Sequence, residues 1–317
     1  MKTQRTTSLK RGFTLMELMV AMAITTVIVS VLVSITSIAL DTWNRSRSEL
    51  RASRQAKSMI DTMARDLESL VTRRGNTHEW LSAVTDPDLA EIGDKMLSTS
   101  ASKLIFFTAA TDRYDGQVGD PKTDKGGDVS CVAYQLDYKN PIDPSDKQFE
   151  TFVLSRLLVN PDDTFEKLLG KTQTDPTKPL PKSLDDLFSS TYASQLADAK
   201  NFVCENVFQF SVTFHVQVTQ VTGSTTTLVN VPVTVGEKTP SFLIQGTGIK
   251  AELTGGSVTT AQLASGRVTA ITISATVLSD FGVEQSKSRT FKDDDAKAKF
   301  FGKNSYQYSK LIQLPSM

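Results

Sequence analysis

The chain opens with a short basic stretch, which is followed by a long run of apolar residues. Between Phe13 and Leu40 the only ionisable side chain is that of Glu17. A run of this length can cross a bilayer, for which about 20 apolar residues in a helix suffice. A carboxylate inside such a segment costs about 2.5–3.5 kcal/mol at the membrane centre and less near an interface. We therefore expect Glu17 to have a cationic partner.

The helical pattern continues beyond Leu40. Apolar residues recur at steps of three and four up to Val71, and charged residues, most of them basic, occupy the opposite side. No proline or glycine interrupts residues 13–74, and Gly75 followed by Asn76 is a helix stop signal. The pattern predicts one helix of about 60 residues, apolar all round in its first half. Its second half has a single apolar stripe, which we expect to pack against a globular body.

The sequence after residue 76 is rich in strand patterns. Residues 76–102 read as a polar connection with a short helix at Asp88–Leu97. We predict strands at Lys103–Ala109, Val129–Tyr138, Thr151–Val159, Phe202–Thr219, Thr225–Val235, Phe242–Gln245, Gly248–Leu253, Arg267–Leu278 and Tyr306–Leu314. Several of them alternate apolar and polar residues, as half-buried antiparallel strands do. The fold predicted is α+β, with a long N-terminal helix packed on an antiparallel β-sheet body. Residues 110–128, 160–201 and 286–303 are predicted to be long loops.

The residues around Gly12 and Phe13 carry a recognisable pattern. Residues 1–12 contain four basic residues and no acid, which favours a cytoplasmic N-terminus. The pattern consists of Arg11, Gly12, Phe13, Thr14, Leu15 and Glu17, followed by the apolar run. It resembles the class III leader of type IV pilins and pseudopilins. The resemblance implies that a prepilin peptidase cuts between Gly12 and Phe13 and methylates the new amine of Phe13.

Two other interpretations of the N-terminal segment remain open. One is an ordinary secretory signal peptide, for which Ser37 and Ala39 offer small residues near a cut. The apolar run is longer than the 7–15 residues usual for such peptides. A signal peptide would also leave the free-energy cost of the Glu17 carboxylate in the membrane unexplained. The other is a plain single-pass anchor in which Glu17 reaches back to the membrane interface.

The body has a weaker resemblance of its own. Tyr134 in VAYQLDY, Leu154 and Arg156 in FVLSRLL, and the strand NVFQFSVTF occur in the order seen in J-type minor pseudopilins of type II secretion systems and in PilW-like minor pilins. The segment Arg54–Leu70, with Arg-Asp-Leu near its end, is similar to the helix that follows the anchor in those families. The chain departs from the pattern in residues 160–201 and in the extra strands of Gly236–Gly256.

Together these features predict a minor pseudopilin-like subunit. Its expected parts are a basic leader (1–12), a transmembrane or fibre-core helix (13–40), an amphipathic continuation (41–75) and a β-rich pilin-like domain (76–317). The resemblance implies assembly into a type II secretion or type IV pilus-like fibre, at or near its tip. The implied partners are prepilin peptidase, other pilin or pseudopilin subunits and inner-membrane lipid, with the globular domain in the periplasm. The alternative is a membrane-tethered or pilus-tip binding module, adhesin-like, that uses the loops of its β-domain.

Composition narrows the remaining chemistry. The 35 basic and 35 acidic residues balance, so no overall field favours nucleic acid. The only histidines, His78 and His215, are not accompanied by cysteine pairs at metal spacing. There is no glycine-rich phosphate loop and no Gly-x-Ser-x-Gly turn. We expect no enzymatic activity and no cofactor.

Two small groups of residues leave alternatives open. Cys131 and Cys204 could form one disulfide in an oxidising compartment or remain buried thiols. Asp112, Asp115 and Asp120 are a weak calcium candidate, because oxygen ligands on a flexible loop suit Ca²⁺. Their spacing does not match the helix–loop–helix calcium pattern and lysines dilute their charge, so a solvated acidic loop without metal is the simpler interpretation.

Overall fold

The computed structural model describes residues 14–85, 103–109, 128–143, 146, 149–169, 183–222, 225–236, 239–251 and 258–314. The chain divides into two compact units, Met1–Ser48 and Glu49–Met317. The helix α1 (Leu15–Glu68) begins in the first unit and ends in the second. Each unit is described below by itself.

The described part of the first unit is helical from Leu15 onward. By length and composition alone, α1 is the one helix in the described residues that could cross a membrane. The hydroxyl groups of four threonines donate hydrogen bonds of 2.8 Å to the carbonyl oxygen four residues earlier: Thr25, Thr26, Thr36 and Thr42. These polar groups are therefore satisfied within the helix itself, as an apolar surrounding requires.

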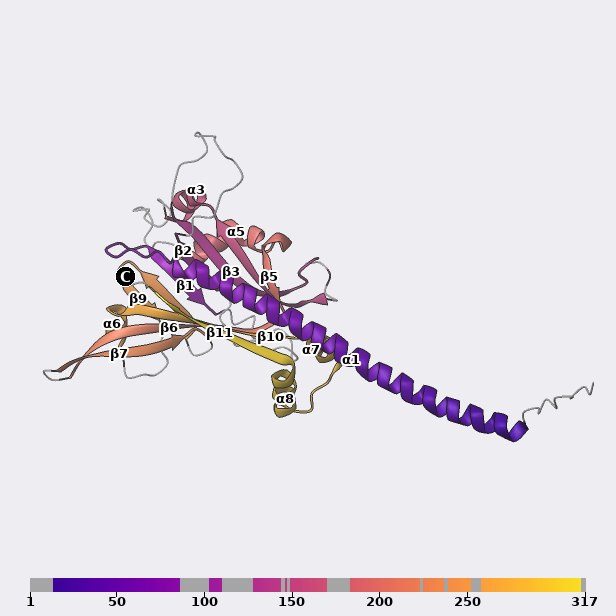
Figure 1. Cartoon of the computed structure of the whole chain (residues 1–317). Helices are drawn as coiled ribbons and strands as arrows, with labels where there is room; N and C mark the ends of the chain where they lie inside the picture. Colours follow the sequence, from indigo (N-terminus) through magenta and orange to yellow (C-terminus); the bar gives the residue numbers. More distant parts are fainter. Residues whose placement is uncertain are drawn as a thin grey trace, which may run out of the picture. The chain divides into compact units, whose positions relative to one another are not determined.

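The second unit contains two antiparallel sheets (Figure 1). The first has the order β5-β4-β3-β2-β1-β8-β9 and the second the order β11-β10-β6-β7. The strands of the first sheet are β1 (Glu79–Val84), β2 (Lys103–Thr108), β3 (Ser130–Lys139), β4 (Thr151–Val159), β5 (Phe202–Glu205), β8 (Ser241–Gln245) and β9 (Gly248–Ala251). Those of the second sheet are β6 (Val207–Thr222), β7 (Thr225–Thr234), β10 (Arg267–Leu278) and β11 (Ser305–Gln313). Pro232 lies in β7, an edge strand, where the missing N–H of proline is tolerated.

Short helices connect the strands. They are α3 (Pro161–Asp163), the π-helical turn η2 (Thr164–Leu169), α5 (Leu184–Leu196), the 3₁₀ turn η3 (Ala199–Asn201), α6 (Thr260–Ala264), α7 (Asp280–Ser288) and α8 (Asp294–Asn304). Side chains at the N-caps fix where several of them begin. At α5, for example, the Ser183 hydroxyl accepts a hydrogen bond of 3.1 Å from the Asp186 N–H.

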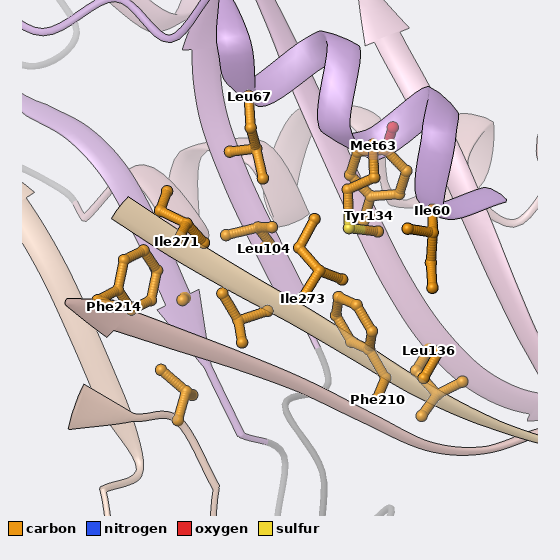
Figure 2. Packing of buried hydrophobic residues seen from close by; sticks show 14 of the residues in the cluster. Ile60, Met63, Leu67, Leu104, Tyr134, Leu136, Phe210, Phe214, Ile271 and Ile273 are labelled. Atoms are coloured by element: carbon orange, nitrogen blue, oxygen red, sulfur yellow. The ribbon is translucent and has the colours of Figure 1, made fainter. Parts of the chain in front are cut away.

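The main core joins the last turns of α1 to both sheets. Figure 2 shows this packing: Ile60, Met63 and Leu67 of α1 face side chains of the first sheet and of the second sheet. The labelled sheet residues are Leu104, Tyr134, Leu136, Phe210, Phe214, Ile271 and Ile273. Small residues, Ala52 and Ala56, are buried earlier along the same stripe of the helix. The amphipathic stripe expected from the sequence is therefore the face that α1 buries in the body.

The opposite face of the first sheet is buried too. A second cluster contains Ile105, Phe107 and Cys131 of the sheet together with Leu187 and Phe188 of α5. Because the sheet is covered on both faces, its central strands are almost continuously apolar instead of alternating.

The structure confirms the predicted fold class, an α+β protein with a long N-terminal helix and antiparallel sheets. Strands β4 and β10 have the predicted bounds. The predicted strand at Phe202–Thr219 is instead two strands, β5 and β6, separated by Asn206, whose φ of 60° breaks the extended backbone.

Three other features differ from the sequence prediction. Helix α1 ends at Glu68, before Gly75, because the Val71 N–H donates to the Phe107 carbonyl at 2.9 Å and draws the chain onto β2. Strand β1 lies in the segment predicted to be a polar connection. Helix α5 lies within residues 160–201, and α8 begins within residues 286–303; both segments are predicted to be loops. The helix predicted at Asp88–Leu97 falls outside the described residues.

Candidate functional site

Thr14 and Glu17 form the start of α1. The Glu17 Oε2 atom accepts hydrogen bonds of 3.0 Å from both the backbone N–H and the hydroxyl of Thr14. In return the Glu17 N–H donates to the Thr14 hydroxyl at 3.2 Å. This is a capping box, in which the first and fourth residues of Thr-x-x-Glu satisfy each other's free donors. The carboxylate is thereby held at the first turn, where the helix dipole favours negative charge.

One oxygen of the Glu17 carboxylate accepts no hydrogen bond from the described residues. Both bonds from Thr14 end on Oε2, and no residue in the described ranges bonds to Oε1. No cation from the described part of the chain pairs with Glu17 either. Gly12 and Phe13, the residues predicted to flank a cleavage site, fall outside the described residues. Thr14, the first described residue, lies directly after them in the sequence.

A second arrangement, inside the body, joins α1 to the first sheet. Arg156 of β4 donates to both carboxylate oxygens of Asp66, from Nε at 2.8 Å and from Nη2 at 2.9 Å. The Tyr134 hydroxyl donates to Asp66 Oδ2 at 2.6 Å, and its oxygen accepts from Arg156 Nε at 3.0 Å. Tyr134 and Arg156 are direct neighbours across β3 and β4. Asp66 is 3% exposed and Tyr134 is fully buried.

The electrostatics of this triad favour a neutral Tyr134 and a charged Arg156. Burial raises the pKa of Tyr134 well above its ordinary value, and the negative charge of Asp66 raises it further. Burial opposes the charge on Arg156, but the hydrogen bonds to Asp66 and Tyr134 outweigh it, so the pKa of Arg156 is raised. Tyr134 therefore stays neutral and donates, while Arg156 stays charged. Paired, bidentate contacts of this kind are the strong class of charged hydrogen bond.

Tyr134, Arg156 and the Arg-Asp-Leu of the helix each stand out in the sequence through the resemblance of the body. Nothing in the sequence predicts that they meet. Asp66 is 68 residues from Tyr134 and 90 from Arg156 in the chain, so no local pattern connects them. Two more exposed ion pairs accompany the triad along α1, Arg51 with Glu205 at 2.6 Å and Lys310 with Asp61 at 2.9 Å.

The comparisons bear on the N-terminal site. Residues 7–33 match the prokaryotic N-terminal methylation motif. The chain carries a prepilin-type N-terminal segment. This segment supports a place in the type IV pilin and pseudopilin superfamily, and it implies processing by prepilin peptidase and assembly with other pilin subunits.

The remaining comparisons add little to the prepilin-type segment. The type IV-like pilin TTHA1219 from Thermus thermophilus is a solved structure with 10% identity to this chain. The alignment covers 84% of this chain and 97% of that one, with a TM-score of 0.30. No curated protein matches the sequence.

Both cysteines are buried free thiols in the structure, so the disulfide that the sequence left open is not formed. Leu154 of β4 lies between Leu136 of β3 and Cys204 of β5. Cys131 is five residues from Leu136 along β3, about 17 Å at the usual rise of a strand. Because Cys204 is level with Leu136 in the sheet, Cys131 and Cys204 are much farther apart than the Cα distance of about 7 Å that a disulfide allows.

The histidines and the calcium candidate carry no site in the described residues. His215 Nε2 is 2.8 Å from the Thr272 hydroxyl, and His78 Nε2 is 3.3 Å from the Leu169 carbonyl. The described ranges contain no group of three acidic, histidine or cysteine side chains that could hold a metal. Asp112, Asp115 and Asp120 lie outside those ranges.

Proposed function

We propose that this chain is a minor pseudopilin-like subunit, cut between Gly12 and Phe13, methylated on Phe13 and assembled through its N-terminal helix. The assembly is a type II secretion or type IV pilus-like fibre, with this subunit at or near the tip. Before assembly, the helix lies in the inner membrane and the body in the periplasm. The match of residues 7–33 to the methylation motif, with Glu17 inside it, carries the proposal.

The cut supplies a counter-charge for Glu17, which pairs with no cation in the described residues. It removes the basic leader and creates an α-amine on Phe13, positively charged near neutral pH. Opposite charges about 4 Å apart attract by about 4 kcal/mol at an effective dielectric of about 20, before the cost of desolvation. We propose that Glu17 of one subunit binds the amine of its neighbour while the apolar residues up to Leu40 pack side by side.

The capping box supports this pairing. Because Thr14 bonds only to Oε2, the Glu17 carboxylate can keep its cap and accept the amine on Oε1. The cap also fixes the side chain within the first turn, which lowers the entropy that the pairing must overcome. The carboxylate therefore has two simultaneous roles, capping the start of its own helix and receiving a partner's terminus.

Sequencing the mature N-terminus by mass spectrometry tests the proposal. The expected result is a chain that begins with N-methylated Phe13. A chain that begins with Met1 and keeps its basic residues would contradict the proposal. A chain that begins near Leu40 would show a secretory signal peptide instead.

A further inference from the structure

A basic cavity lies within the body. It has a volume of about 290 Å³ and is lined by the segment that follows α1, the β8–β9 hairpin and the turn between α6 and β10. Three of its lining residues are arginines, Arg73, Arg74 and Arg267, and none of the described lining residues is acidic. The cavity therefore has an excess of positive charge.

The side chain of Arg267 has an unpaired hydrogen-bond donor among the described residues. Its Nε atom is buried and has no hydrogen-bond partner within the described part of the chain. Buried polar groups are nearly always paired, and a charged donor left unpaired is costly. The terminal N–H groups of a guanidinium form a fork that matches two oxygens of a carboxylate or phosphate. Arg267 lines the cavity and is partly exposed, so an oxyanion there meets the terminal nitrogens of its guanidinium.

The other two arginines are free to serve the same ligand. Arg73 and Arg74 are exposed at the cavity. Neither forms an ion pair within the residues that the structure describes, and the same holds for Arg267. The three arginines carry like charges that repel one another, and no acidic residue of the described lining offsets them. A bound anion would relieve this repulsion.

Tight packing fixes the shape of the cavity. Gly248 has a φ of +134°, and a Cβ there would collide with the Ala264 carbonyl oxygen. The Gly75 N–H donates to the Gly246 carbonyl and the Gly246 N–H to the His78 carbonyl, each at 2.9 Å. These bonds hold the β8–β9 hairpin against the segment that carries Arg73 and Arg74. A preformed site of this kind loses little entropy on binding.

We propose that this cavity binds an oxyanion, a carboxylate or phosphate group, through Arg267 with Arg73 and Arg74 at its rim. Its volume corresponds to about ten water molecules, enough for one such group and part of the molecule that carries it. The site does not involve Glu17 or the prepilin-type segment, so it stands whether or not the proposed assembly is correct.

Calorimetry on the full chain in detergent micelles tests the proposal. Inorganic phosphate is titrated at an ionic strength held constant with sodium chloride, and a short peptide ending in two glutamates is titrated in parallel. We expect saturable binding of at least one of them. Phosphate alone would assign the site to a free phosphate-bearing ligand, whereas the peptide would assign it to a carboxylate of a polypeptide.

Matched arginine variants show where the anion binds. Arg267→Gln should weaken binding at least about tenfold, because a charged hydrogen bond is lost. Arg54→Gln, which removes an exposed guanidinium from α1, should leave it unchanged. Because Arg267 is the first residue of β10, Arg73→Gln with Arg74→Gln provides a second test at exposed positions outside the sheet. No saturable binding of either probe, or an equal loss in Arg54→Gln, would overturn the proposal.

Discussion

Asp66 of α1 and Arg156 of β4 form a bidentate ion pair in the interior of the body, with N–O distances of 2.8 and 2.9 Å. Tyr134 completes the pair by donating to the same carboxylate at 2.6 Å. The buried stripe of α1 supplies apolar contact, but apolar contact tolerates small shifts along the helix. The ion pair requires one alignment, and it therefore fixes the register of α1 on the sheet.

Asp66→Asn should destabilise the body by about 3–5 kcal/mol, because it leaves the Arg156 charge buried without its partner. The matched control is Asp61→Asn on the same helix, which breaks the half-exposed pair with Lys310 and should cost far less stability, because water screens exposed ion pairs. Denaturant unfolding of the full chain in micelles measures both. Equal losses in the two variants would contradict a special role for Asp66.

The body should lose stability in alkali. The pKa of Tyr134 is raised in the folded state, so above about pH 10 the unfolded chain releases this proton while the folded chain keeps it. The contribution of Tyr134 to stability is therefore full below about pH 10 and is lost as the pH rises. Cys204, whose pKa burial raises to about 12, adds to the same trend. Tyr134→Phe should make the decline between pH 10 and 11 shallower, which unfolding curves at each pH would show. An unchanged decline would exclude Tyr134 as a contributor.

Glu17→Gln should still insert into the membrane but fail to join the fibre, because an amide cannot form the ion pair with a neighbour's amine. Glu68→Gln, at the other end of α1 and exposed, is the matched control and should assemble normally. Membrane fractionation reports insertion, and co-purification with the other pilin subunits reports assembly. Normal co-purification of Glu17→Gln would refute the proposed pairing.

Gly12→Phe should block processing, since the resemblance of the leader places the cut directly after this glycine. The expected result is a precursor that keeps its basic leader and migrates above the mature protein on a denaturing gel. The same substitution at Gly302, which lies in α8 with open space beside it, should leave processing intact. A mature-sized Gly12→Phe product would place the cut elsewhere.

Both cysteines should be found as free thiols. In denaturant without reductant, a maleimide should label Cys131 and Cys204, adding two labels by mass. Under native conditions labelling should be slow, because both side chains are buried and burial raises the pKa of each thiol. A chain that accepts no label until it is reduced would show that the two are joined.

The parts of the fold with a regular local pattern could be predicted from the sequence. Strands β4 and β10 were predicted at their observed bounds. Helix α5 is not predicted by the sequence pattern, because prolines precede it and many of its residues are polar. Its apolar residues Leu184, Leu187 and Phe188, which cover the sheet, are too few to stand out. Strand β1 is six residues long and is stabilised by pairing with β2 and β8 rather than by its own pattern.

The candidate sites likewise divide into those with a local sequence pattern and those formed by distant segments. Thr14 and Glu17 are three residues apart, so the sequence alone contains the signal for the capping box, in addition to the cost of the Glu17 charge and the leader pattern. The triad of Asp66, Tyr134 and Arg156 and the three-arginine cavity depend on chain segments that meet only after folding. Composition and spacing contain no signal for such contacts.

Pro232 has one further consequence. A neighbouring polypeptide that tried to extend the second sheet along β7 would meet a position with no amide hydrogen to offer, and one rung of the new ladder would be missing. The addition of further strands at this edge of the sheet is therefore disfavoured. Many copies of the body can lie close together without forming a continuous sheet through β7.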